Sequence, residues 1–301
     1  MSAMPQRTTA ADFDPEVLRL FDQYVHGQID RRGFLDRAAR VAVGGSAGAA
    51  AMLAALSPNF ARAQQVAPND ARIKTAFVEF PSQAGYGTVR AYVARPALAT
   101  GPLPVVLVVH ENRGLNPHIE DIARRLALDN FIALAPDALF PLGSYPGDED
   151  KARALFGKLD QAKTREDFIA SAAYARNIEG GNGKLGAVGF CYGGGVVNML
   201  ATRVPELAAG VAYYGNAPAL QQVGSIKGDL MLMFADNDER TNAGWPAFEA
   251  ALKAAGVRFA AYRYPGTEHG FNNDTTPRFD EKAAKEAWSR TVALFNRTLR
   301  G

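Results

Sequence analysis

The alternation of strand-like and helix-like segments from about residue 73 onward most constrains the fold of this 301-residue chain. The run PVVLVVHE, residues 104–111, is apolar almost throughout, as expected of a strand buried on both faces of a parallel sheet. The next segment, HIEDIARRLALDN, carries apolar residues at helical spacing. This alternation continues to a final helix expected over 281–299, and it predicts a mostly parallel, doubly wound α/β sheet with helices on both faces.

The first two strand-like segments have no helix between them. IKTAFVEF and TVRAYVARP alternate polar and apolar residues with period two, and residues 84–87 supply a turn. We therefore expect an N-terminal antiparallel hairpin at the edge of the sheet. Because no linker-like segment follows Pro68, one catalytic domain over about 70–301 is the simplest division.

Residues 1–63 have the character of a leader. Arg31 and Arg32 precede Gly-Phe-Leu, an uncharged stretch covers 41–57, and Ala61-Arg62-Ala63 is a small-x-small cleavage pattern. This resembles a twin-arginine export signal, which predicts a periplasmic or secreted protein, cleavage after Ala63 and the export machinery as a partner. The alternative is a membrane anchor, but the stretch is shorter than the roughly 20 strongly apolar residues that a span needs, so no permanent span is expected.

Charge and cysteine content exclude other classes. The 33 basic and 31 acidic residues are spread along the chain, with no basic block that would favour a nucleic-acid partner. A single cysteine excludes an internal disulfide.

That cysteine, Cys191, lies in the sequence GFCYGG, directly after one apolar strand and before a helix. This is the context of a nucleophile elbow, a sharp turn that exposes the nucleophile at the carboxyl edge of a sheet. The flanking glycines avoid a collision across the turn, and the backbone N–H of Tyr192 can donate to an oxyanion. The alternative is a buried apolar filler, because free cysteine is often fully buried.

The order of the remaining residues favours the nucleophile. In an α/β-hydrolase the acid and then the histidine follow the nucleophile. Only one of the four histidines, His269, lies after Cys191, and the turn FADNDERT supplies an acid before it. Asp236 and Asp238 compete for that role; we choose Asp238 and expect Asp236 to form the turn.

Several motifs in order make the chain resemble the dienelactone hydrolase family over about 73–297: VVHENRGLN, ALAPD, ARNIEGGNGKLGAVGFCYGGG, AGVAYYG and EHGF. The resemblance implies an α/β-hydrolase fold with Cys191 as nucleophile, His269 as base and Asp238 as the acid that orients it. It also implies that Glu111 contacts the resting cysteine and controls thiolate formation. The N–H of Asn112 would be the second oxyanion donor.

The chemistry of these residue types is consistent with this role. A free thiol has a pKa near ~8.5, so His269 is needed to take its proton. The thiolate would attack a small ester or lactone, and water would hydrolyse the resulting thioester, with no metal or organic cofactor required. His110, Glu111 and His118 lack the helical spacing of a zinc motif, so we expect no metal there.

The substrate is less well defined by the sequence. The arginines that bind the dienelactone carboxylate in the family are not at matching positions, although Arg113 and Arg278 are candidates to replace them. A thioesterase, an acyltransferase or a peptidase on the same scaffold remains possible, as does a non-catalytic periplasmic binding protein.

Overall fold

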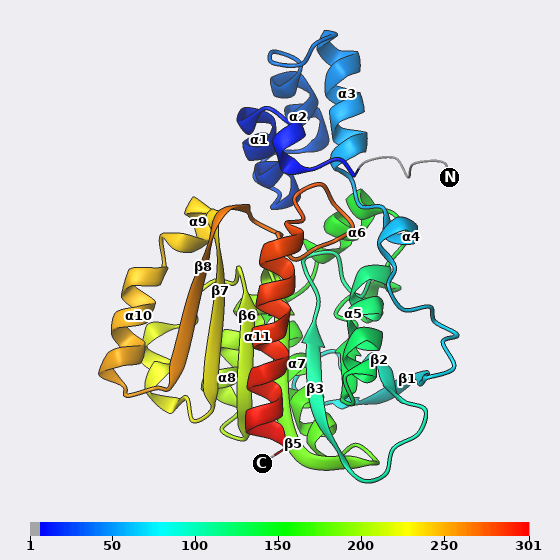
Figure 1. Cartoon of the computed structure of the whole chain (residues 1–301), viewed down its shortest axis with the longest axis vertical. Coiled ribbons are helices and arrows are strands. Elements are labelled where there is room, and N and C mark those ends of the chain that lie inside the picture. Colours follow the sequence, from blue (N-terminus) through cyan, green and yellow to red (C-terminus); the bar gives the residue numbers. More distant parts are fainter. Residues whose placement is uncertain (1–6, 301) are drawn as a thin grey trace.

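One eight-stranded sheet forms the centre of the molecule in the computed structural model, which describes residues 7–300 (Figure 1). The strand order is β1-β2-β4-β3-β5-β6-β7-β8. The strands are β1 (Ile73–Ser82), β2 (Gly87–Pro96), β3 (Leu103–Val109), β4 (Ile132–Pro136), β5 (Gly181–Phe190), β6 (Leu207–Tyr213), β7 (Asp229–Asn237) and β8 (Phe259–Glu268). The predicted α/β-hydrolase architecture is thereby confirmed.

The pairing of the strands also matches the expected topology. β1 and β2 form an antiparallel hairpin in which Ile73 is opposite Pro96, and β1 lies at the edge of the sheet. β2 pairs antiparallel with β4, whereas the strands from β3 to β8 run parallel to one another. β2 is therefore the one strand that runs against the rest.

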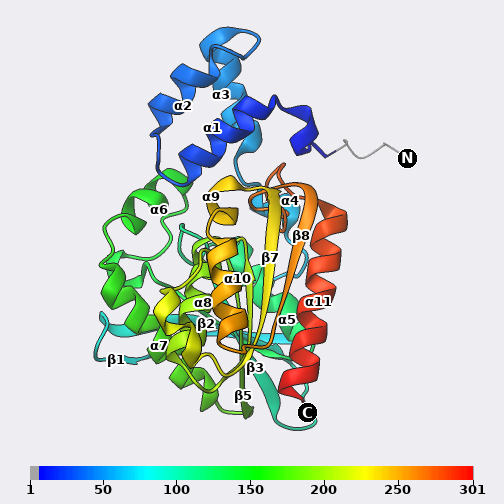
Figure 2. The same ribbon diagram turned by 90° about the vertical axis from the view of Figure 1, so that its left-hand side faces the viewer.

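Helices cover both faces of the sheet (Figure 2). α5 (Pro117–Leu128) and α11 (Glu281–Leu299) pack on one face, and α7 (Gln161–Arg176), α8 (Tyr192–Arg203) and α10 (Trp245–Ala254) pack on the other. The shorter helices α6 (Glu149–Phe156) and α9 (Glu239–Asn242) follow the carboxyl ends of β4 and β7. Each face has its own apolar core, so the strands between them are buried on both sides.

The N-terminal residues fold into three further helices, α1 (Pro15–Val25), α2 (Arg31–Ala38) and α3 (Gly45–Leu56), which lie together beyond one end of the sheet in both views (Figures 1 and 2). They share a separate apolar cluster that includes Phe21, Phe34 and Leu53. We call residues 14–56 the N-terminal helical segment. Across residues 7–300, none of the helices is both long enough and apolar enough to cross a membrane.

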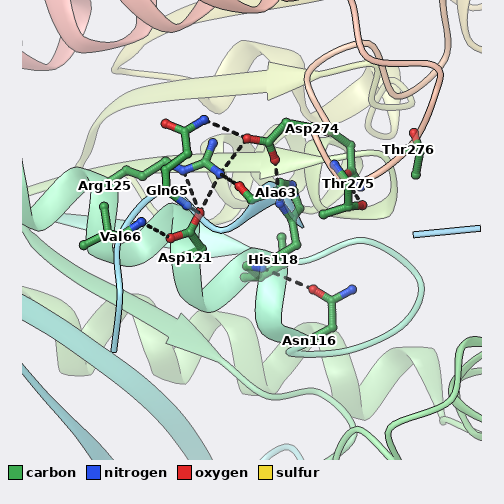
Figure 3. A network of polar contacts seen from close by, with 12 residues as sticks. Ala63, Gln65, Val66, Asn116, His118, Asp121, Arg125, Asp274, Thr275 and Thr276 are labelled. Carbon is green, nitrogen blue, oxygen red and sulfur yellow. Dashed lines mark hydrogen bonds and ion pairs between the residues drawn. The ribbon is translucent and has the colours of Figure 1, made fainter. Parts of the chain in front are cut away.

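A polar network anchors the connection from α4 (Phe60–Ala63) to the sheet (Figure 3). The backbone N–H groups of Gln65 and Val66 donate to the Asp121 carboxylate at 3.1 and 2.8 Å. Arg125 bridges Asp121 to Asp274, and the Gln65 side chain donates to Asp274 at 2.7 Å. The connection is thus fixed both to α5 and to the loop after β8.

The turn from β5 into α8 passes very close to neighbouring backbone. A Cβ placed on Gly189 would lie 2.1 Å from the carbonyl oxygen of Gly193, and one on Gly193 would lie 2.2 Å from that of Val109. Because backbone atoms cannot move aside cheaply, only glycine fits at these two positions.

We expect Gly189→Ala to lower the free energy of unfolding by about 2 kcal/mol or more, because the added methyl group has no space. Urea denaturation followed by circular dichroism measures this loss. Gly224→Ala is the matched control, since a Cβ there meets nothing within 4 Å. Equal stabilities of the two variants would contradict the steric argument.

Candidate active site

Cys191 occupies the strained turn between β5 and α8. Its φ of 54° and ψ of −114° are unusual for a residue with a side chain, and its N–H donates to the Tyr213 carbonyl at 3.0 Å. This conformation is the one expected of a nucleophile elbow. Tyr192 follows as the first residue of α8, where a backbone N–H has no acceptor within the helix.

His269 and Asp238 meet at the carboxyl ends of β8 and β7. The His269 Nδ1 lies 2.6 Å from the Asp238 Oδ2, and both side chains are almost fully buried. Asp238 is held in place because its other carboxylate oxygen accepts from the N–H of Thr241 at 3.2 Å. The His269 Nε2 is buried without a hydrogen-bond partner, so it is available to exchange a proton.

Asp236 has a different environment from Asp238. It forms an ion pair with Arg263 at 2.6 Å on the surface and accepts from the N–H of Gly266 at 3.1 Å. The structure therefore places Asp238 beside His269, and Asp236 in the turn.

A second histidine, His26, reaches Cys191 from the N-terminal helical segment. Its Nε2 lies 3.4 Å from the Cys191 Sγ, and its ring centre lies 4.6 Å from that of His269 at an interplanar angle of 85°. Its Nδ1 is 2.8 Å from the Asp22 carbonyl oxygen and 3.2 Å from the Asp22 carboxylate. Sequence reasoning missed His26 because it treated this segment as a leader. The available signal was an Asp–His pair four residues apart on an amphipathic helix.

The donor atoms of His26, Cys191 and His269 all lie within 4.8 Å of one another, the only such group found among residues 7–300. However, the Arg240 guanidinium lies 3.0 Å from the His26 Nε2 and 3.5 Å from the His269 Nδ1. A metal ion would be repelled by this positive charge, so we assign the three residues to acid–base chemistry.

Glu111 and Asn112 lie in the loop after β3. The Glu111 carboxylate accepts from the Asn273 side chain at 3.0 Å, whereas the hydrogen-bond partner of the Cys191 sulfur is His26. Glu111 is thus in the expected pocket but oriented towards Asn273. The Asn112 side chain donates to the Val25 carbonyl at 2.9 Å, which ties this loop to α1.

Arg113 and Arg278, the two candidates for binding a substrate carboxylate, both face α1. Arg113 donates to the Val25 carbonyl at 3.1 Å, and Arg278 lies 3.6 Å from the Asp22 carboxylate. The two guanidinium groups lie near the carboxyl end of α1, where a positive charge interacts favourably with the helix dipole. Both arginines therefore help to hold the N-terminal helical segment in place.

A cavity of about 370 Å³ opens over the cysteine, a size suited to a small ligand. Cys191 and His269 line it from the sheet, and Tyr145 lines it from the loop after β4. The N-terminal helical segment forms the facing wall, mainly with Phe21, Tyr24 and His26. The segment thus narrows the cavity but leaves the sulfur accessible within it.

The charges around the sulfur favour its ionised form. Burial opposes ionisation of the Cys191 thiol, but the positive charges of His269 and His26 outweigh it and lower its pKa to about 5. Burial likewise opposes protonation of His269, but the Cys191 thiolate and the hydrogen bond that His269 donates to Asp238 raise its pKa to about 10. The pKa of His26 is also raised, because the Cys191 charge and Asp22 outweigh its burial.

Comparison with known proteins identifies the family. The chain belongs to the dienelactone hydrolase family, whose model matches residues 89–299. As a member of this family it is a hydrolase with the α/β-hydrolase fold. A separate family model, described as YqhI-like, matches residues 4–42.

Three relatives illustrate the similarity. An Escherichia coli (strain K12) protein named "Putative hydrolase fragment YghX" is 50% identical over 112 residues, which are 37% of this chain and 96% of that protein. The "Putative carboxymethylenebutenolidase" of the same strain is 32% identical over 242 residues, covering 76% of this chain and 88% of the relative. The crystal structure titled "Putative Dienelactone Hydrolase" from Klebsiella pneumoniae aligns with a TM-score of 0.64 at 30% identity, covering 74% of this chain and 99% of the other.

We expect the alkylation rate of Cys191 by iodoacetamide to rise through a pKa near 5, and not near the ~8.5 of a free thiol, because the neighbouring imidazolium charges stabilise the thiolate. Rate constants measured by mass spectrometry between about pH 4 and pH 10 test this. The reaction of glutathione under the same conditions is the reference. A profile that follows glutathione would mean that the two histidines leave the thiol unperturbed.

Proposed function

We propose that the protein hydrolyses a small ester or lactone through Cys191, His269 and Asp238. The observation that carries this proposal is the 2.6 Å contact between His269 and Asp238 beside a cysteine in a strained elbow conformation. The three residues come from separate strands and meet at one edge of the sheet. A purely structural cysteine has no need of that arrangement.

In the proposed reaction, the Cys191 thiolate attacks the carbonyl carbon and forms a tetrahedral intermediate. Asp238 keeps the His269 ring oriented so that its Nε2 faces the cavity. His269 donates a proton to the departing alkoxide, which leaves a thioester on Cys191. Water then attacks the thioester with His269 as base, and the acid is released.

Two backbone N–H groups are suited to stabilise the oxyanion. Tyr192 begins α8, so its N–H is free and lies at the positive end of the helix. Asn112 lies in the loop opposite, and its side chain is held by the Val25 carbonyl. Backbone donors fixed in this way need no reorganisation during the reaction.

The cavity supports a small and uncharged substrate. Its volume of about 370 Å³ restricts the acyl and alkoxy groups. Arg113 pairs with Glu149 at 3.5 Å and Arg278 with Asp22 at 3.6 Å, so the charges of both arginines are already compensated. We therefore propose a neutral ester or lactone instead of dienelactone itself. A panel of aryl esters, lactones, thioesters and peptides, compared by kcat/KM, tests this against the related acyl-transfer activities.

We expect Asp238→Asn to lower kcat/KM for an aryl ester by at least about 100-fold, because the neutral amide no longer stabilises the protonated imidazole. Cys191→Ala should abolish turnover. Asp236→Asn is the matched control: it is the same substitution two residues away, on the surface, and should keep full activity. Unchanged hydrolysis of the aryl ester by Cys191→Ala would contradict the proposed mechanism.

We also propose that the chain is exported through its Arg31-Arg32 motif. Both arginines are exposed at the start of α2, and export by this route accepts folded proteins. The predicted cleavage site after Ala63 adjoins the anchored connection, and Ala63 is only 9% exposed. Cleavage there requires this stretch to leave the folded surface.

For this proposal we expect the chain in the periplasmic fraction, and Arg31→Lys combined with Arg32→Lys to keep it in the cytoplasm, because the twin-arginine pathway recognises the arginine pair. Immunoblotting of the fractions and N-terminal sequencing measure both points. A chain that keeps Met1 and stays in the cytoplasm in both forms contradicts export.

A further inference from the structure

We propose that His26, contributed by the N-terminal helical segment, is a second catalytic base that takes the Cys191 thiol proton and leaves His269 to serve the leaving group and the water. This inference rests on the proposed ester hydrolysis. It concerns the uncleaved chain, in which residues 7–63 are folded against the catalytic domain; cleavage after Ala63 would remove His26 and with it this role.

The contacts of the sulfur point to this division of roles. The hydrogen-bond partner of the Cys191 Sγ is the His26 Nε2, at 3.4 Å. The His269 Nε2 is buried without a hydrogen-bond partner, although it lines the same cavity. The sulfur therefore lies within hydrogen-bond distance of His26 and within 4.8 Å of the His269 nitrogen, so both imidazoles act on its charge and His26 is placed to accept the thiol proton.

The orientation of the His26 ring suits a base. Its Nδ1 lies 2.8 Å from the Asp22 carbonyl oxygen and close to the Asp22 carboxylate, so the Nδ1 carries a proton and the Nε2 presents its lone pair. Asp22 supports His26 through its backbone carbonyl and, at 3.2 Å, through the charge of its carboxylate, whereas Asp238 supports His269 through its carboxylate at 2.6 Å. Two Asp–His pairs therefore converge on one sulfur from different parts of the chain.

The charged groups around His26 come from each element packed against it. Asp22 on α1 and the Cys191 thiolate favour its protonated form, whereas His269 and the Arg240 guanidinium on α9 oppose it. Arg240 approaches the Nε2 at 3.0 Å and can donate to it only while that nitrogen is unprotonated, in competition with the Cys191 thiol for its single lone pair. Transfer of the thiol proton to the Nε2 therefore displaces the Arg240 donor.

α1 is held firmly enough to position His26. The Val25 carbonyl accepts from both Asn112 and Arg113 at 2.9 and 3.1 Å. The Arg153 guanidinium lies 4.1 Å from the ring centre of Tyr24, and the Tyr24 hydroxyl bonds to Asp150. The last turn of α1 is thus fixed by residues of the catalytic domain on either side of the cavity.

The proton balance of the proposed cycle is complete. The thiol proton passes to the His26 Nε2 and stays there, while His269 begins in its protonated form. The S–C bond forms, the C–O bond breaks, and the alkoxide takes the His269 proton. Water then gives one proton to His269 as its oxygen bonds to the acyl carbon, and the C–S bond breaks to restore the thiolate and release the carboxylic acid.

The test compares His26→Gln with Arg19→Gln in the full-length protein. Glutamine keeps a polar side chain but cannot take the thiol proton, whereas Arg19 lies on the exposed face of the same helix and pairs with Glu16. We expect His26→Gln to shift the pH profile of iodoacetamide alkylation upward by about one unit, which slows the reaction about tenfold at pH 4 and about twofold at pH 6. Arg19→Gln should leave both unchanged.

Two further variants separate the roles. His269→Gln should lose ester turnover and slow alkylation in part, because the His269 charge also stabilises the thiolate, but alkylation should stay faster than in the His26→Gln/His269→Gln double variant. Asp22→Asn should shift the alkylation profile in the same direction as His26→Gln without removing the imidazole. Added imidazole should restore part of the alkylation rate of His26→Ala.

An alkylation profile of His26→Gln that matches the unmodified protein would overturn the proposal, as would an equal shift in Arg19→Gln. Because alkylation needs no ester substrate, this result is independent of the proposed function. If the unmodified protein hydrolyses no ester but His26→Gln still shifts the alkylation profile as expected, the proposed hydrolase function is contradicted and the role of His26 as the base for the thiol stands.

Discussion

The close passage of backbone at the β5–α8 turn is the constraint on which the site depends. Gly189 and Gly193 let the strand turn into the helix with no side chain between them. This contact holds Cys191 at a positive φ, with its side chain in the lining of the cavity. The N–H of Tyr192 is placed by the same turn, so one steric condition positions both the proposed nucleophile and a proposed oxyanion donor.

Electrostatics then decide the state of that sulfur. A buried thiol is ordinarily harder to ionise, and here the two imidazoles overcome that effect. Each imidazole is in turn supported by a carboxylate, Asp238 for one and Asp22 for the other. The cost of burying charge is therefore offset within a compact group in which positive and negative charges alternate.

The fold and the part of the site that the catalytic domain contributes could be predicted from the sequence, because both follow from local sequence patterns. The apolar run of β3 and the order of Cys191, Asp238 and His269 are fixed by strand periodicity and by the fold's topology. His26 could not be found in this way. Its contact with the sulfur joins residues 165 positions apart and depends on how α1 docks against Arg113 and Arg278. The orientation of Glu111 towards Asn273 is a similar tertiary outcome.

The hydrogen-bond network around Asp274 joins the chain to the catalytic domain directly after the predicted cleavage site. Gln65 and Val66 are bound to Asp121 and Asp274 by their own backbone and side-chain groups, on the C-terminal side of Ala63. A chain that lost everything before Gln64 would keep these bonds, and with them the support of the loop that carries His269. It would lose His26 altogether. The two histidines therefore lie in parts of the chain that match separate family models, and a chain without the N-terminal helices would keep Cys191, Asp238 and His269 but lack His26.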